Sequence, residues 1–203
     1  MSTKLIDLFP TAILKTNIID SGRYDAEELA ELGKALASEG APFNPDLLIG
    51  EGDMKTCFVE DWRHGTYILN DDTTILEIIN QGLSQMSRQE GLEYVAMSDS
   101  WYTVMNKGSR IHRHRHDSNI FSGTLFINMP EGSTGISFVN PTNVYKTLNR
   151  NNTQTKYSSP SHMVEAKTGD MIIYPSWLEH FVPVQTCDNR ITISFNADYK
   201  RLK

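Results

Sequence analysis

The chain has 203 residues, a formal net charge of −6 and a sequence pI near 5.5. This length suits a single domain, and the acidic balance argues against a protein that binds nucleic acid through a broad basic surface. With 39% hydrophobic and 22% charged residues, the composition is that of an ordinary globular protein. No apolar run has the length of a membrane span, so none is expected.

The whole chain, residues 1–203, is expected to form one domain because no repeat, linker or low-complexity tract divides it. The start MSTKLIDLFP lacks the pattern of a secretory signal, which predicts a cytoplasmic protein. Cys57 and Cys187 have no metal-ligand spacing and are expected to be reduced thiols.

The first part of the chain, residues 1–95, is expected to supply an N-terminal strand and supporting helices. The short apolar start, from Leu5 to Leu14, predicts an edge strand that is entered through Pro10. Apolar residues recur at helical spacing in 24–38 and again in 72–89. Gly40 and Gly91 follow these runs and are expected to end the two helices. Both helices are expected to pack one face against a sheet.

The second part, residues 96–203, is rich in strands. Strand-like runs cover 98–105, 111–116, 123–129, 135–139, 162–166, 170–174 and 190–196. Turn residues separate them at 106–108, 130–132, 167–169 and 188–189, and the polar stretch 142–161 predicts a long loop. Helices followed by many short strands predict an α+β domain, mainly β, in the form of a sandwich or short barrel.

The strand 190–196 is expected to have two unlike faces. Alternate residues of a strand point to opposite sides, which places Arg190, Thr192, Ser194 and Asn196 together and Ile191, Ile193 and Phe195 on the other side. The polar side fits either the lining of a ligand cavity or simple exposure to water.

Three histidines alternate in the stretch IHRHRHD, at His112, His114 and His116. On a strand all three would share one face, with Arg113 and Arg115 on the other. Neighbours on that face lie about 7 Å apart and a metal–nitrogen bond spans about 2 Å, so two of the imidazoles can reach one divalent ion. The pattern alone leaves open which two bind.

His180 is the candidate for a third ligand, because it follows an apolar strand and a Pro-containing turn. Arg190 comes ten residues later, and antiparallel strands joined by a turn at 186–189 would bring it back beside His180. A guanidinium there could bind a carboxylate through two parallel hydrogen bonds. His64 and His162 have no partners at ligand spacing and are interpreted as structural.

With these residues the chain resembles the prolyl-4-hydroxylase-like group of Fe(II)/2-oxoglutarate oxygenases, and within it an uncharacterised bacterial and viral branch. The likeness is carried by LFPT, HRHDSNIFSG, GDMIIYPSWLEHFV and RITISFN, which lie along nearly the whole chain. In that group a glycine precedes the first ligand histidine by six residues, as Gly108 precedes His114. This spacing favours His114 with His116 over His112 with His114.

The resemblance implies a double-stranded β-helix (a jelly-roll, cupin-like fold) with helices packed on one sheet. It implies that His114, His116 and His180 bind Fe(II), that Arg190 binds the distal carboxylate of 2-oxoglutarate, and that Thr192 accompanies the arginine. Residues 96–203 would be the metal-binding core. One departure matters: His116 stands where the common site has a carboxylate, which leaves the native metal open.

The predicted activity is that of a 2-oxoglutarate-dependent dioxygenase, which hydroxylates a substrate and releases succinate and CO2. No acid–base residue is required, so no catalytic residue is assigned. The expected partners are dioxygen and a small molecule or peptide side chain, with a homodimer allowed for and no membrane or nucleic acid. The alternatives are a cupin-type metalloenzyme that does not use 2-oxoglutarate, and a non-catalytic β-barrel binding module.

Overall fold

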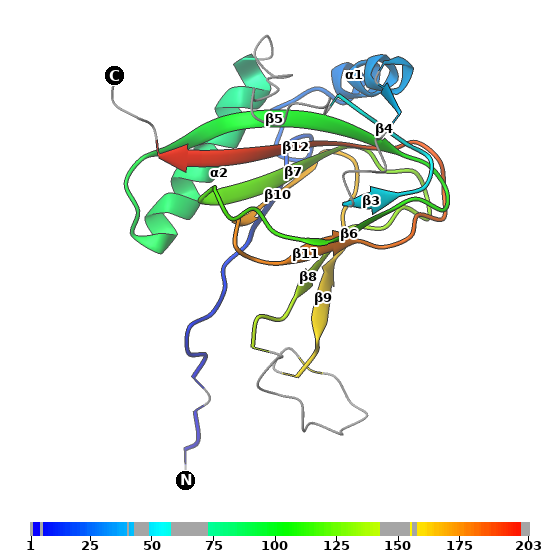
Figure 1. The fold of residues 1–203 in the computed structure, drawn as a ribbon. Coiled ribbons are helices and arrows are strands. Elements are labelled where there is room, and N and C mark those ends of the chain that lie inside the picture. Colours follow the sequence, from blue (N-terminus) through cyan, green and yellow to red (C-terminus); the bar gives the residue numbers. More distant parts are fainter. Residues whose placement is uncertain are drawn as a thin grey trace.

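Two antiparallel sheets face each other in the computed structural model, which describes residues 2–4, 6–39, 41–42, 49–57, 73–142, 155 and 158–199 (Figure 1). The seven-stranded sheet has the order β1-β10-β7-β12-β5-β4-β2 and the five-stranded sheet the order β3-β6-β11-β8-β9. The strands are β1 Leu14–Asn17, β2 Ala41–Pro42, β3 Gly50–Glu51, β4 Met54–Thr56, β5 Val95–Met105, β6 Arg110–His114, β7 Phe121–Asn128, β8 Ile136–Val139, β9 Ser161–Val164, β10 Asp170–Pro175, β11 His180–Val182 and β12 Arg190–Tyr199. This is the predicted double-stranded β-helix.

Both predicted helices are confirmed, as α1 Ala26–Ser38 and α2 Thr73–Glu90. Asp25 caps α1 by accepting hydrogen bonds from the backbone of Glu27 and Glu28. Gly91 ends α2 in the left-handed conformation, with φ 68°. Gly40, the expected stop of α1, lies outside the described residues, and the C-cap is Glu39. Neither helix in the described part of the chain has the length and apolar character needed to cross a bilayer.

The helices cover the outer face of the seven-stranded sheet, away from the smaller sheet (Figure 1). Buried side chains from α1 and α2 join those of β5, β7, β10 and β12 in the main hydrophobic core. Gly82 of α2 lets the helix approach closely, because a Cβ there would lie 2.7 Å from Ile173. The helices therefore bury one face of this sheet, and the opposite face is left to line the space between the two sheets.

The predicted N-terminal strand is partly wrong. Pairing begins only at Leu14, where β1 joins β10 at the edge of the seven-stranded sheet. The described residues before it form an arm, in which Leu8 and Phe9 are 75% and 96% exposed. Figure 1 shows this arm leaving the body of the domain. Apolar character was therefore a poor guide to where the strand starts.

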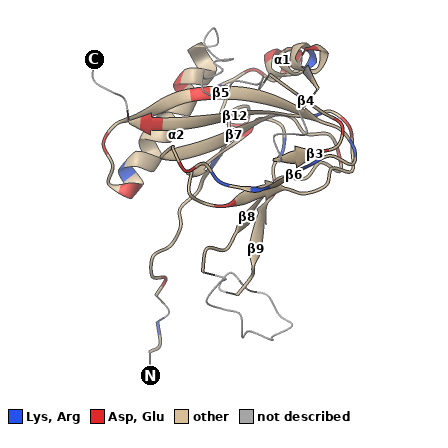
Figure 2. Cartoon of the chain, viewed as in Figure 1, with Lys and Arg blue, Asp and Glu red and all other residues tan. Residues whose placement is uncertain are grey.

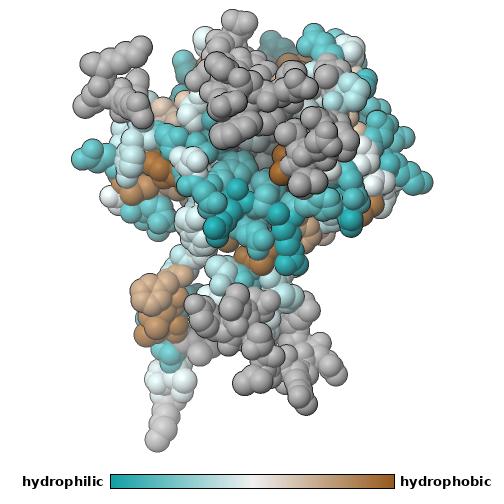
Figure 3. Space-filling view, in the orientation of Figure 1, coloured by the Kyte–Doolittle hydropathy of each residue, from teal (hydrophilic) through white to brown (hydrophobic). Residues whose placement is uncertain are grey.

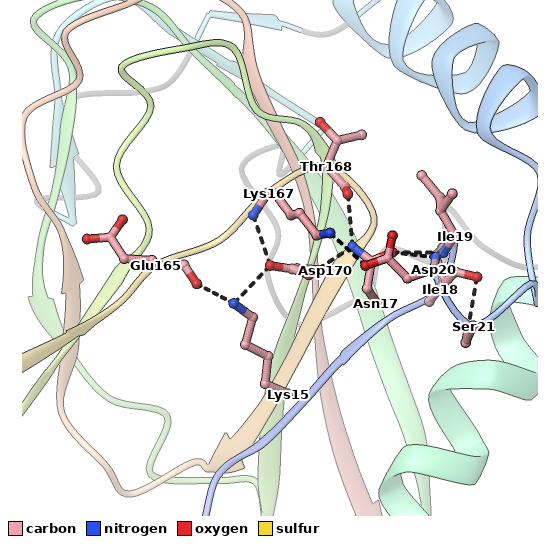
Figure 4. A network of polar contacts seen from close by, with 10 residues as sticks. All are labelled: Lys15, Asn17, Ile18, Ile19, Asp20, Ser21, Glu165, Lys167, Thr168 and Asp170. Carbon is pink, nitrogen blue, oxygen red and sulfur yellow. Dashed lines mark hydrogen bonds and ion pairs between the residues drawn. The ribbon is translucent and has the colours of Figure 1, made fainter.

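A buried carboxylate fixes β1 to the turn before β10 (Figure 4). Asp170 accepts hydrogen bonds from Asn17 Nδ2 at 2.8 Å and from the backbone of Lys167 at 2.9 Å. Its Oδ2 also lies 3.0 Å from Lys15 Nζ. One side chain thus joins two segments that are distant in sequence.

Replacement of Asp170 by alanine is expected to lower the free energy of unfolding by about 1–3 kcal/mol, because part-buried donors lose their acceptor. Urea denaturation measures the loss. Asp20→Ala is the matched control, since it removes only the exposed partner of Lys167 and should change stability little. Equal losses in the two variants would contradict the assignment.

Candidate metal centre

His114, His116 and His180 come together between the two sheets. One ring nitrogen from each lies within 4.8 Å of the others, and the ring centroids are 4.3 to 5.4 Å apart. Metal–nitrogen bonds of about 2 Å mean that small rotations of the rings would bring all three onto one ion. Within the described residues this is the one cluster of potential metal ligands.

The backbone fixes the orientation of two of these rings. The Nδ1 atoms of His114 and His180 each lie 2.9 Å from a carbonyl oxygen, that of His112 and that of Leu178. A carbonyl can only accept, so both Nδ1 atoms carry the proton and both Nε2 atoms carry a lone pair that can bind a metal. The hydroxyl of buried Tyr174 lies 3.2 Å from Nε2 of His180. These rings therefore have the tautomer that a metal ligand needs.

His116 lies outside the strand that was predicted to hold it, since β6 ends at His114. Its backbone N–H donates to Ser176 O at 3.0 Å, and its Nδ1 lies 2.6 Å from Asn196 Oδ1. The loop between β10 and β11 and the strand β12 thus position this ring.

The expectation that three alternating histidines share one face is wrong. His180 pairs with His114 and Val182 with Ile111, so β6 has one residue more than β11 between these pairs. This bulge places Ile111 and His114 on the cavity wall and sends His112 towards Glu51, at 3.6 Å. Arg115, expected on the opposite face, borders the cavity instead.

Basic and acidic positions lie close together along the chain in and beside β6, coloured blue and red in Figure 2. Arg110 Nε lies 2.6 Å from Glu51, and Arg115 Nε lies 2.7 Å from Asp117. Asp117 is used by this exposed pair and not by the histidine cluster. The stretch is therefore not a free basic patch.

The polar side of β12 lines a cavity, which is the first of the two alternatives that the sequence left open. Arg190, Thr192, Ser194 and Asn196 all face a cavity of about 440 Å³ that also contains the three histidines. Ile191, Ile193 and Phe195 lie in the core under the helices. The expectation that Arg190 and His180 lie on two strands paired with each other is wrong. β12 pairs with β5 and β7, whereas β11 pairs with β6 and β8. They reach the cavity from opposite sheets.

Arg190 is a buried cation, only 2% exposed. Its Nε donates to Thr134 O at 2.9 Å, and the guanidinium lies 5.4 Å from the centre of the Phe126 ring. Burial lowers its pKa to about 10, which still leaves it charged at neutral pH. No carboxylate among the described residues forms an ion pair with it. A buried charge of this kind calls for an anion in the cavity.

Trp101 lines this cavity, with its ring 6.0 Å from that of His116. Tyr102 follows Trp101 on β5 and therefore points to the opposite side, into the main hydrophobic core under the helices. Trp177 is exposed on a different surface of the domain. His162 is exposed on β9, and His64 lies outside the described residues, as does most of the loop predicted at 142–161. Sequence reasoning missed Tyr174, because it reads as one more apolar position of a buried strand.

Burial keeps the three imidazoles neutral. Desolvation lowers the pKa of His114 to about 4 and that of His180 to about 3, and it also lowers the pKa of His116. A neutral imidazole is the form that binds a metal. Without a metal, the same burial makes the fold sensitive to acid.

The metal-free protein is expected to lose stability as the pH falls from 6.5 towards 4. In this range the unfolded chain binds protons at His114 and His180 and the folded chain does not, so unfolding is favoured by about 1.4 kcal/mol per pH unit for each histidine. Thermal unfolding in chelator at pH 7.5, 6 and 5 measures the slope. His180→Gln removes one buried titrating group and should flatten the slope. Equal slopes in the wild type and this variant would refute the linkage.

Residues 99–196 match a family model described as "Putative 2OG-Fe(II) oxygenase". The sequence matches none of the curated proteins with which it was compared.

Several solved structures have a similar fold. A Pseudomonas putida prolyl-4-hydroxylase is 14% identical with a TM-score of 0.59, covering 94% of each chain. A 2OG-Fe(II) oxygenase family oxidoreductase from Burkholderia pseudomallei is 16% identical with a TM-score of 0.60, covering 93% of this chain and 85% of that one. HygX from Streptomyces hygroscopicus, solved with nickel and 2-oxoglutarate, is 9% identical with a TM-score of 0.59, covering 95% and 85%.

Proposed function

Because the chain belongs to the superfamily of 2-oxoglutarate- and Fe(II)-dependent oxygenases, we propose that His114, His116 and His180 hold the iron and that Arg190 binds the keto acid. The superfamily makes the protein an enzyme that uses dioxygen and a small-molecule or peptide substrate. Neither alternative, a cupin-type metalloenzyme without 2-oxoglutarate or a binding module, has an observation in its favour.

The observation that carries the proposal is one cavity with two unlike ends. At one end three neutral imidazoles converge. At the other a buried guanidinium has no anionic partner among the described residues. A dicarboxylate with a keto group matches both ends, since its keto-acid end can chelate a metal while its distal carboxylate meets Arg190.

The chemistry that bound iron and 2-oxoglutarate supply in such enzymes is hydroxylation of a C–H bond by dioxygen, coupled to conversion of the keto acid to succinate and CO2. The chain's own residues bind and orient. The three imidazoles would hold the ion, Arg190 and Thr192 would orient the keto acid, and the apolar walls would restrict water. No side chain is required to transfer a proton.

The substrate enters from the side of Trp101 and Arg115, in this proposal. Both side chains border the cavity near His116, and a cavity of about 440 Å³ that also accepts the keto acid suits a small molecule or a single peptide side chain.

An anaerobic titration tests the proposal. Metal-free protein with Fe(II) and 2-oxoglutarate is expected to develop the weak visible charge-transfer band of a chelated keto acid, and after air is admitted it should release succinate. Fe(II) with succinate in place of 2-oxoglutarate is the control and should give no band. Stoichiometric iron binding without the band would favour a cupin-type enzyme, and failure to bind iron would favour a binding module.

We also propose that the chain forms a homodimer and does not bind nucleic acid. Figure 3 shows apolar side chains gathered on the N-terminal arm, where Ile6, Leu8 and Phe9 are all more than two-thirds exposed. A second copy could cover them. Light scattering that gives the 23.0 kDa mass of one chain would refute the dimer. The proposal on nucleic acid rests on the net charge of −6, which disfavours contact with a phosphate backbone.

A further inference from the structure

A row of polar side chains crosses the inner face of the seven-stranded sheet beside His116. In the strand register Asn196 of β12 lies between Ser122 of β7 and Asp99 of β5. Asn196 Nδ2 donates to Asp99 Oδ1 at 2.9 Å, and Ser122 Oγ donates to Asn196 Oδ1 at 2.9 Å. Asn196 Oδ1 also lies 2.6 Å from Nδ1 of His116. The row thus ends on the imidazole that stands where a carboxylate is usual.

From this row we infer that Asp99 and Asn196 are positioning residues that fix the tautomer of His116. The inference rests on the proposed function, in which His116 binds the metal. The other two histidines do not need such a device, because their Nδ1 atoms face backbone carbonyls. His116 has no backbone carbonyl at its Nδ1, and a side chain must supply the acceptor.

The direction of the row follows from what each group can donate or accept. A carboxylate only accepts, so Asp99 holds the amide of Asn196 with its NH2 group towards itself. Asn196 must then present its oxygen to His116 and Ser122. An amide oxygen also only accepts, so Nδ1 of His116 carries the proton and Nε2 keeps its lone pair for the metal. Rotation of the amide would reverse this choice.

The carboxylate of Asp99 is itself held in position by a hydrogen bond from its neighbour on β5. Ser98 Oγ donates to its second oxygen at 3.0 Å, which leaves the first for Asn196. Ser176 Oγ lies 2.8 Å from Ser122 Oγ, and the backbone carbonyl of Ser176 accepts from His116 N. Ring and acceptor are therefore anchored to the same part of the fold. The negative charge of Asp99, which is linked to the His116 ring through two hydrogen bonds, also partly replaces the charge of the missing carboxylate ligand.

The tautomer can be read directly in metal-free protein by long-range ¹H–¹⁵N correlation of the histidine rings at a pH where they are neutral. Wild-type His116 is expected to show protonated Nδ1. In Asp99→Asn the Asn196 amide is free to rotate. In Asn196→Leu the amide oxygen is absent, which leaves Nδ1 of His116 only the hydroxyl of Ser122 at 3.1 Å, a group that can either donate or accept. Both variants should show a mixture of tautomers, or protonated Nε2, at His116 alone, while His114 and His180 stay unchanged.

The same variants are expected to bind Fe(II) or Co(II) roughly 10–100-fold more weakly, the usual cost of losing an outer-shell partner. Asp198→Asn is the matched control. Asp198 lies on β12 like Asn196 and accepts from Asn119 at 2.8 Å. This Asn–Asp pair contacts no histidine, so its loss should leave tautomer and affinity as in the wild type.

An unchanged His116 tautomer in Asp99→Asn would overturn the inference, as would equal changes at all three histidines together with a lower melting temperature. The ring spectra need neither iron nor 2-oxoglutarate. They would therefore report on Asp99 and Asn196 even if the proposed oxygenase activity proved wrong.

Discussion

Replacement of Arg190 by methionine is expected to abolish most binding of 2-oxoglutarate while metal binding is kept. The guanidinium is the only described cation buried in the cavity wall, and its loss leaves the distal carboxylate of the keto acid in an apolar space. Truncating one partner of a buried charge pair costs about 2–5 kcal/mol, which corresponds to a loss of affinity of roughly 30-fold or more.

The same substitution should cost little stability, and this separates a binding role from a structural one. Arg190 gives up its hydrogen bonds to the carbonyl of Thr134 and to the sulfur of Met105, but an unpaired buried cation is also removed. Replacing a buried charge with an apolar side chain of similar size is often neutral or stabilising. A variant that unfolds easily and binds no keto acid would point to a structural role instead.

Two milder variants refine the test. Arg190→Lys keeps the charge but lacks the planar pair of donors, so its affinity should fall between those of the wild type and Arg190→Met. Thr192→Val removes one hydroxyl and should cost about 1 kcal/mol. Anaerobic titration of the visible band measures all three. Full activity and unchanged 2-oxoglutarate affinity in Arg190→Met would favour a metalloenzyme that does not use the keto acid.

The parts of the fold that depend on local rules could be predicted from the sequence. The helical spacing of leucine and isoleucine gave α1 and α2 to within two residues at each end. The turn residues were equally informative, since Gly108, Gly132, Gly169 and Asn189 all have positive φ angles. The alternation along β12 correctly separated the cavity side from the core.

Features that depend on pairing between distant strands could not be predicted. The bulge in β6 is set by its register with β11, and nothing in IHRHRHD marks it. The assignment of β11 and β12 to opposite sheets is likewise a property of the whole fold, so a turn between His180 and Arg190 wrongly suggested a hairpin. The row from Asp99 to His116 joins residues that are 97 and 80 positions apart, with no signal in either local sequence.

Alanine substitutions at the four histidines of the site region are expected to divide into one silent variant and three severe ones. His114→Ala, His116→Ala and His180→Ala each remove a proposed ligand, so their loss of Fe(II) affinity should exceed the roughly 10–100-fold cost of losing an outer-shell partner. His112→Ala should bind like the wild type, because its imidazole lies outside the cavity beside Glu51.

The alanine series distinguishes the two possible ligand pairs, because His112 and His114 lie on the same strand and differ mainly in the side to which the bulge directs them. The alternation of the three histidines, taken alone, allowed either neighbouring pair to bind. Isothermal titration with Co(II) under chelator-free conditions gives the four affinities, and melting curves of the metal-free proteins show whether each variant is folded. A severe loss in His112→Ala with normal binding in His116→Ala would reverse the choice of pair. The same result would also contradict the inference that Asn196 holds His116 as a metal ligand at the position where a carboxylate is usual.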